Sequence, residues 1–190
     1  MFAETLQRYL GVLGVELSHK QINQLEEHFN LLTRWNKALN LTRIGEIEAT
    51  VQRHYCESIF LGIHLPGGPL RIVDVGSGGG FPGIPVAVFR SDCSVALVEA
   101  HQRKAVFLRE ATRGLRNTLV IPKRAEEVSE AFDWAASRAV NYHGVQAALN
   151  RMAPNIALLS GEDSPNPRFT WNKIKLPWGN RRFLWLWSST

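Results

Sequence analysis

The sequence contains few of the residues that mark disulfide-linked, metal-binding or membrane-spanning proteins. Its two cysteines, Cys56 and Cys93, are isolated and form no CxxC or other metal-ligand spacing. No apolar run reaches the ~18 residues that a membrane-spanning helix needs. The first residues lack a basic stretch followed by an apolar one, so we expect no signal peptide and a cytoplasmic location with reduced thiols. We expect no bound metal and no membrane contact, and we expect a monomer.

The sequence does contain enough apolar residues for one core. Of its 190 residues 45% are hydrophobic, and the net charge is only +5, which excludes an intrinsically disordered chain. The charge is uneven, because residues 1–100 carry 8 basic and 10 acidic side chains whereas residues 101–190 carry 14 and 7. A basic half is typical of proteins that bind polyanions. It is also typical of a well-solvated surface, so charge alone decides nothing.

The first third of the chain is predicted to be helical. Residues 2–40 read as helix, with Ser18 as an N-cap and with apolar residues at three- and four-residue steps from Leu25 to Leu39. A second helical stretch is predicted over residues 47–62. Two prolines and two glycines at 66–69 then interrupt the pattern. We therefore divide the chain into a helical N-terminal extension, residues 1–66, and one compact domain, residues 67–190.

Strands and helices alternate after this boundary. Strands are predicted over residues 70–75, 94–99, 118–121, 132–136 and 155–160, and helices over residues 83–89, 102–113 and 143–151. Such alternation is typical of an α/β fold with a doubly wound, mostly parallel sheet that helices cover on both faces. Near the C-terminal end, predicted strands over 169–176 and 183–187 flank a turn at 177–180. This pattern predicts an antiparallel hairpin.

The first predicted strand ends in a glycine-rich loop at residues 73–83. Ligands of open α/β sheets bind at the carboxyl ends of the strands, and glycines let the backbone approach a ligand closely. Two interpretations compete. Gly78-x-Gly80-x-x-Gly83 matches the dinucleotide fingerprint of NAD enzymes, and a lone match of that kind is weak. The pattern D-x-G-x-G-x-G resembles motif I of the class I S-adenosylmethionine methyltransferases and is filled by Asp74, Gly76, Gly78 and Gly80.

Two details favour the methyltransferase. In a dinucleotide site the first glycine directly follows the strand, but Gly76 and Ser77 precede Gly78 here. Asp74, an acid just before the glycines, is unfavourable beside a pyrophosphate and favourable beside a sulfonium ligand that carries an ammonium group. Glu99, at the end of the second strand, is placed to accept hydrogen bonds from ribose hydroxyls. Both cofactor classes use such a carboxylate, so an NAD-linked oxidoreductase stays open as an alternative.

Further short motifs lie on both sides of the glycine loop. Together with the loop from Asp74 to Pro85 they are Trp35-Asn36-Lys37, Asn40-Leu41-Thr42, Arg53-His54 with Ser58, Arg103-Lys104 before Phe107-Leu108, Arg124-Ala125-Glu126-Glu127 and Ser137-Arg138-Ala139. In these motifs, from about Gln24 to Leu159, the chain resembles the ribosomal RNA small-subunit methyltransferase G family (RsmG, also called glucose-inhibited division protein B, GidB). The chain departs from the family pattern at Glu57, where aspartate is usual, and at Ser160, where lysine is usual. The segment after Ser160 is also shorter than usual.

The resemblance implies N7 methylation of a guanine in 16S (small-subunit) ribosomal RNA, with S-adenosyl-L-methionine as the methyl donor and the RNA or the ribosomal particle as partner. It implies that Gly76 and Phe81 line the cofactor, that Ala125 and Glu126 border the adenine, and that Arg138 acts at the junction of cofactor and substrate. Guanine N7 already has a lone pair, so we expect no general base and assign no catalytic residue beyond a positioning role for Arg138. The full predicted cofactor site is Asp74, Gly76, Gly78, Phe81, Glu99, Ala125, Glu126 and Arg138.

A basic helix is the second candidate site. Arg103, Lys104, Arg109 and Arg113 share one helical stretch, where contact with RNA phosphates and plain solvation are equally good interpretations. We expect this helix and Arg138 to form one basic surface. A non-catalytic RNA-binding module is therefore another alternative to the enzyme.

Overall fold

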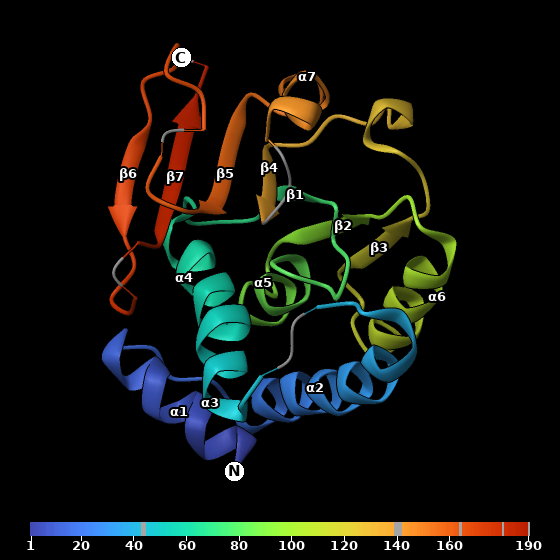
Figure 1. The fold of residues 1–190 in the computed structure, drawn as a ribbon, viewed down its shortest axis with the longest axis vertical. Coiled ribbons are helices and arrows are strands. Elements are labelled where there is room, and N and C mark those ends of the chain that lie inside the picture. Colours follow the sequence, from blue (N-terminus) through green and yellow to red (C-terminus); the bar gives the residue numbers. More distant parts are fainter. Residues whose placement is uncertain (43–44, 139–141, 164, 180, 190) are drawn as a thin grey trace.

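A computed structural model describes residues 1–42, 45–138, 142–163, 165–179 and 181–189 (Figure 1). Within these residues seven strands form one sheet, in the order β3-β2-β1-β4-β5-β7-β6. The strands are β1 (Arg71–Val75), β2 (Ser94–Val98), β3 (Thr118–Ile121), β4 (Trp134–Arg138), β5 (Asn155–Ser160), β6 (Asn172–Lys175) and β7 (Phe183–Ser188). β1 to β5 pair in parallel, and β7 pairs antiparallel with both β5 and β6. The predicted mostly parallel sheet with an antiparallel C-terminal hairpin is confirmed.

Helices cover the sheet on both faces, as predicted. They are α1 (Phe2–Val12), α2 (His19–Leu39), α3 (Ile47–Thr50), the π-helical η1 (Val51–Cys56), α4 (Glu57–His64), α5 (Gly83–Phe89), α6 (Gln102–Ala111), the 3-10 turn η2 (Ala125–Glu127) and α7 (Tyr142–Met152). α5 packs against α4 and β2, whereas α7 packs against β5 and η2. Figure 1 shows α2 running along the base of the molecule, where it packs on α5 and α6.

Side chains that alternate along a strand belong to different cores. On β1, Ile72 lies in one buried cluster with α1, α4 and α5, while Val73 lies in a second cluster with α7. This period of two places one apolar layer on each face of the sheet. Because Phe2 of α1 and Leu97 of β2 share the first cluster, the N-terminal helices pack onto the core of the sheet. The division at residues 66 and 67 remains a prediction.

The helical region predicted over residues 2–40 consists of two helices. α1 ends before Gly14, whose φ is +65°. α2 begins after Ser18, which the structure confirms as the N-cap: the Ser18 hydroxyl accepts a hydrogen bond from the Gln21 N–H at 3.3 Å, and the Gln21 side chain accepts one from the Ser18 N–H at 2.9 Å. This reciprocal capping box fixes where the second helix starts.

The starts of β4 and β6 differ from the prediction for local reasons. β4 begins at Trp134 rather than Phe132, because the Phe132 N–H donates to the carbonyl of Met152, the end of α7. β6 is shorter than residues 169–176, because Asn166 holds the preceding chain in a turn by accepting a hydrogen bond from Trp171 Nε1. The predicted hairpin turn includes Asn180 and the Ser-Arg-Ala motif ends at Ala139, and both residues lie outside the described ranges. None of the helices in those ranges is long and apolar enough to cross a membrane.

Candidate functional site

The glycine loop lies at the carboxyl end of β1 and is anchored by two carboxylates. Glu99 directly follows β2, and its Oε2 accepts a hydrogen bond from the Gly78 N–H at 2.9 Å while its Oε1 accepts one from the His101 N–H at 2.8 Å. Asp74 Oδ2 accepts a hydrogen bond from the Gly83 N–H at 2.9 Å, at the first residue of α5. Glu99 therefore holds the middle of the loop and Asp74 holds its C-terminal end, before any ligand is considered.

Two glycines in this loop are required for different reasons. Gly78 has a φ of +53°, and a Cβ there would meet only ordinary contacts, the nearest being the Leu41 carbonyl oxygen at 3.7 Å. The backbone conformation, which L side chains rarely adopt, is what demands glycine at this position. At Gly80, with a φ of +89°, a Cβ would also lie 2.4 Å from Ile84 Cδ1. Gly80 is thus enforced by packing as well as by conformation.

Asp74 lies inside the protein, beneath the loop. Its side chain is fully buried, and its Oδ1 has no hydrogen-bond partner within the described residues. Burial raises the pKa of the Asp74 carboxyl to about 7, although the hydrogen bond from the Gly83 N–H acts in the opposite direction. The observed contact shows Asp74 supporting the loop. Direct contact between Asp74 and a ligand remains a prediction.

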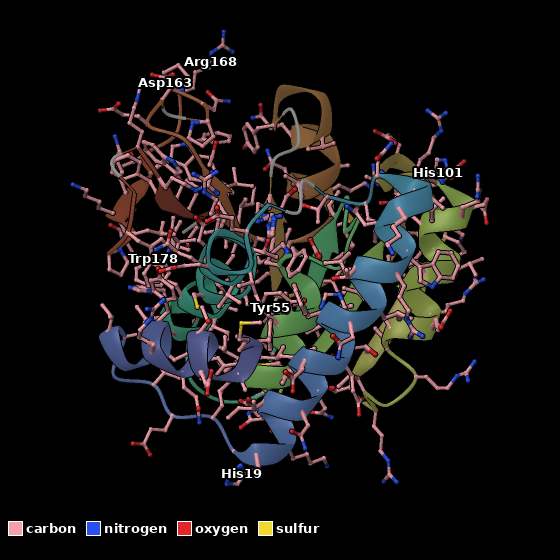
Figure 2. All side chains as sticks on the ribbon, turned by 60° about the horizontal axis from the view of Figure 1, so that its bottom comes forward. His19, Tyr55, His101, Asp163, Arg168 and Trp178 are labelled. Atoms are coloured by element: carbon pink, nitrogen blue, oxygen red, sulfur yellow. The ribbon has the colours of Figure 1, made fainter. Side chains whose placement is uncertain are left out.

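A buried histidine connects the loop to the N-terminal helices. His28 of α2 lies 3.0 Å from the Gly79 carbonyl oxygen through Nε2 and 3.0 Å from the Tyr55 hydroxyl through Nδ1. A carbonyl oxygen only accepts, so Nε2 carries the proton and Nδ1 accepts from the Tyr55 hydroxyl. Figure 2 shows Tyr55 near the middle of the molecule, and its side chain is fully buried. The helical extension is therefore hydrogen-bonded directly to the glycine loop through His28.

The neutral state of His28 makes stability depend on pH. Burial lowers the pKa of His28 from 6.5 to about 4, so the unfolded chain binds a proton that the folded chain does not. The contribution of His28 to the free energy of unfolding is therefore fully present above pH 6.5 and is lost as the pH drops toward 4. Between pH 7 and pH 5 we expect the contribution of His28 to the free energy of unfolding to fall by about 2 kcal/mol.

Urea unfolding of the wild type and of His28→Gln at both pH values measures this contribution. The variant has no titrating group at position 28, so it should lose about 2 kcal/mol less than the wild type over the same interval. The raised pKa of Asp74 acts in the opposite direction in this window, but it is common to both proteins. An equal pH dependence in the two proteins would contradict the neutral buried histidine.

An open cavity of about 600 Å³ lies beside the glycine loop. Its walls come from the segment after α2, from α3 and η1, from the loop itself and from two arginines that flank the sheet's carboxyl edge. The described lining residues are Leu41, Thr42, Gly45, Ala49, Thr50, Arg53, His54, Gly76, Ser77, Gly78, Gly79, Phe81, Arg138 and Arg182. Three of them are arginines and none is an acid. The volume suits a small-molecule ligand, and the three arginines suit an anionic group such as a carboxylate or a phosphate.

Arg138, the last residue of β4, is fixed within this cavity. Its Nη1 donates to the Arg53 carbonyl oxygen at 2.8 Å, and its guanidinium lies over the Phe81 ring at 5.2 Å from the centroid. Burial lowers the pKa of Arg138 to about 10, so the side chain stays charged at neutral pH. The His54 ring also stacks on the Phe81 ring, and the two ring centroids lie 5.0 Å apart. The cavity wall is thus a stack of a cation and two rings.

The comparisons with known proteins place this site in a family. Residues 21–155 match the family model described as rRNA small subunit methyltransferase G. The chain belongs to this family. It is 41% identical over 138 residues to the ribosomal RNA small subunit methyltransferase G of Chromobacterium violaceum, covering 70% of this chain and 66% of that protein. It is 36% identical over 140 residues to the protein of the same name from Vibrio atlanticus, covering 72% and 66%. The matches thus span just under two thirds of these relatives' length.

Solved structures support the same fold. A SAM dependent methyltransferase from Aquifex aeolicus superposes with a TM-score of 0.58 at 14% identity, covering 75% of this chain and 93% of its own. A methyltransferase from Pyrococcus furiosus superposes with a TM-score of 0.59 at 16% identity, covering 88% and 98%. The Rossmann-like class I methyltransferase fold predicted for this family member is confirmed.

The predicted adenine-side residues of this family member lie on η2. Ala125 is buried and Glu126 is exposed. The Arg151 Nη2 donates to the carbonyl oxygens of Ala125, Glu126 and Val128 at 3.0, 3.2 and 2.9 Å. Arg151 was not predicted as a site residue. The sequence around it gives no sign that this helical arginine donates hydrogen bonds to a turn some 25 residues earlier. Contact of Ala125 and Glu126 with a ligand remains a prediction.

The basic helix lies apart from the cavity lining. Arg103, Arg109 and Arg113 are exposed and Lys104 is partly exposed, and no residue of α6 lines the cavity that holds Arg138. α6 packs instead on α2 and β3. The cations that the structure brings together are Arg53, Arg138 and Arg182. Arg53 was part of the family motif without an assigned role, and Arg182 was missed altogether.

Proposed function

We propose that this chain is an S-adenosylmethionine-dependent methyltransferase that methylates N7 of a guanine in small-subunit ribosomal RNA, in the cytoplasm. The observation that carries the proposal is that Arg138 and the glycine loop line one cavity in a member of the methyltransferase G family, with Glu99 holding the loop from behind through the Gly78 N–H. The names of the relatives supply the substrate class. The departure at Ser160 lies at the end of β5 and outside the cavity lining.

The described residues fit a cofactor of this kind. The cavity beside the loop has the volume of a ligand site, Gly78 leaves its face open, and Glu99 retains acceptor capacity beyond its two backbone hydrogen bonds. Gly76, Gly78 and Phe81 would line the cofactor, Glu99 would accept from its ribose, and Ala125 with Glu126 would border its adenine. Bound S-adenosylmethionine would supply an electrophilic methyl group to a nucleophile in the cavity.

The residues of the chain need to position and shield rather than to move protons. Guanine N7 carries an in-plane lone pair, so no proton has to be removed before methyl transfer. The work left to the protein is to align the reacting atoms and to exclude water. Arg138 is suited to the first task because its guanidinium is fixed by Phe81 and by the Arg53 carbonyl. The N7 edge of duplex RNA lies in a groove too narrow for side chains, so the target is a loop or an opened strand.

The RNA strand would also contact a basic surface that lies outside the cofactor cavity. The exposed side chains of Arg103 and Arg109 on α6 and of Arg113 in the turn after it, with Lys104 of α6, are candidates for phosphate contacts. Removing Arg109 and Arg113 together should lower the salt dependence of RNA binding and leave cofactor affinity unchanged. We expect the protein to act as a monomer.

Cofactor binding separates the three candidate functions. Calorimetry should show saturable binding of S-adenosylhomocysteine and none of NADH. Binding of NADH in preference would instead identify an oxidoreductase. RNA binding with neither cofactor would identify a non-catalytic RNA-binding module.

Glu99 is expected to hold the cofactor's ribose. In Glu99→Ala the ribose hydroxyls lose a charged acceptor, so S-adenosylhomocysteine binding should weaken by ~1.5–3 kcal/mol, as measured by calorimetry. Glu99→Gln is the matched control, since it keeps one oxygen acceptor at nearly the same size and should lose less. An unchanged dissociation constant in Glu99→Ala would exclude this role.

A further inference from the structure

Arg182 reaches the cavity from a part of the chain beyond the residues that the family model matches. It directly precedes β7 and lies outside the matched residues 21–155. Its Nε and Nη2 donate to Glu57 Oε1 and Oε2 at 2.6 and 2.5 Å, although 125 positions separate the two residues in the sequence. Glu57, the first residue of α4, is fully buried, whereas the Arg182 side chain is 35% exposed. A buried carboxylate thus fixes a cation that still faces solvent.

The pair leaves most of the guanidinium free to bind a ligand. Arginine has five N–H donors, and the bonds to Glu57 occupy two of those on Arg182. The planar group matches the oxygens of a phosphate in a bidentate arrangement. Held in place by Glu57, it would lose little side-chain entropy when a ligand binds. The fully buried carboxylate is shielded from the cavity, which no described acid lines.

We propose that Arg182, oriented by Glu57, binds a backbone phosphate of the RNA strand at the mouth of the cavity, together with the exposed Arg53. This proposal rests on the proposed function. A phosphate is favoured over the cofactor carboxylate because Arg138, not Arg182, stacks on Phe81 of the glycine loop. Arg53 is exposed and Arg182 is partly exposed, and the guanidinium of Arg182 is bonded to Glu57 rather than to that loop.

The neighbouring Arg181 provides a matched control. It is also paired with a glutamate, Glu162, at 3.0 Å, but this pair is at the surface and Arg181 does not line the cavity. Arg181→Gln and Arg182→Gln remove the same charge one residue apart. A general electrostatic attraction to RNA would make the two variants alike. A phosphate contact at Arg182 would make them different.

The experiment is a salt titration of binding to a single-stranded fragment of small-subunit ribosomal RNA, beside calorimetry with S-adenosylhomocysteine. For Arg182→Gln we expect roughly tenfold weaker RNA binding and a slope of log affinity against log salt that falls by about 0.7. S-adenosylhomocysteine affinity should not change. For Arg181→Gln we expect near-wild-type RNA affinity.

A second variant guards against misfolding. Arg182→Gln leaves the buried Glu57 carboxylate without its partner, which can destabilise the fold. Glu57→Gln/Arg182→Gln removes both charges and should fold with the same loss of RNA affinity and slope. Equal RNA binding by this double variant and the wild type would overturn the phosphate role and leave the methyltransferase intact. A matching loss of S-adenosylhomocysteine affinity would reassign Arg182 to the cofactor carboxylate. A wild type that binds no RNA would overturn both proposals.

Discussion

Gly78→Val should fold and yet fail to bind S-adenosylhomocysteine at concentrations where the wild type is saturated. Gly78 has a φ of +53°, and a β-branched side chain at such an angle forces the loop into another conformation. Moving the loop also breaks the hydrogen bond from the Gly78 N–H to Glu99 Oε2. The cofactor site would lose both the space beside Gly78 and the hydrogen bond that joins the loop to the Glu99 carboxylate.

Calorimetry measures the loss, and thermal unfolding confirms that the variant is folded. Gly114→Val is the matched control, because a Cβ at Gly114 meets nothing within 4 Å and its φ lies outside the left-handed range. The control should bind S-adenosylhomocysteine like the wild type. Near-wild-type affinity in a folded Gly78→Val protein would remove the glycine loop from the cofactor site.

Arg138→Ala should reduce turnover far more than it reduces RNA affinity. Arg138 lies against the Phe81 ring of the glycine loop and donates to the Arg53 carbonyl, so its removal frees both the ring and the η1 backbone at the proposed place of reaction. Misplacement of reacting groups on that scale costs roughly hundredfold in kcat. RNA affinity should change by less than in Arg182→Gln.

Single-turnover methyl transfer, compared with RNA binding for the same protein, measures the two effects. Arg138→Lys keeps the charge but not the planar group that stacks on Phe81, so we expect only partial recovery of turnover. If Arg138→Ala kept its kcat but bound RNA more weakly, Arg138 would be a phosphate contact without a role in positioning the reacting groups. Full turnover in Arg138→Ala would exclude it from the reaction centre.

The parts of the site that the sequence could predict are those whose residues are close along the chain. The loop from Asp74 to Gly83 carries its own backbone requirements, and Glu99 follows the next strand at a spacing that the parallel sheet dictates. Both were predicted at the correct edge of the sheet. The sequence could not show that Asp74 points inward to the Gly83 N–H rather than into the cavity.

The parts that the sequence could not predict depend on contacts between distant segments. Arg182 becomes a cavity residue only because β7 inserts beside β5 and brings it to Glu57. His28 becomes a neutral loop support only because α2 packs under the glycine loop, 51 residues away. Neither residue differs in its local sequence from an ordinary surface arginine or helical histidine. The strand ends at Trp134 and Asn172 likewise depend on tertiary hydrogen bonds.

The most direct test is methyl transfer from labelled S-adenosylmethionine to small-subunit ribosomal particles, followed by mapping of the modified base. We expect label in one guanine of the small-subunit RNA, at N7, detected by strand scission specific for 7-methylguanosine. Gly78→Val should abolish the signal, and Gly114→Val should retain it. Label at an exocyclic amine or a ribose hydroxyl, or no transfer by a chain that binds S-adenosylhomocysteine, would contradict the proposed reaction.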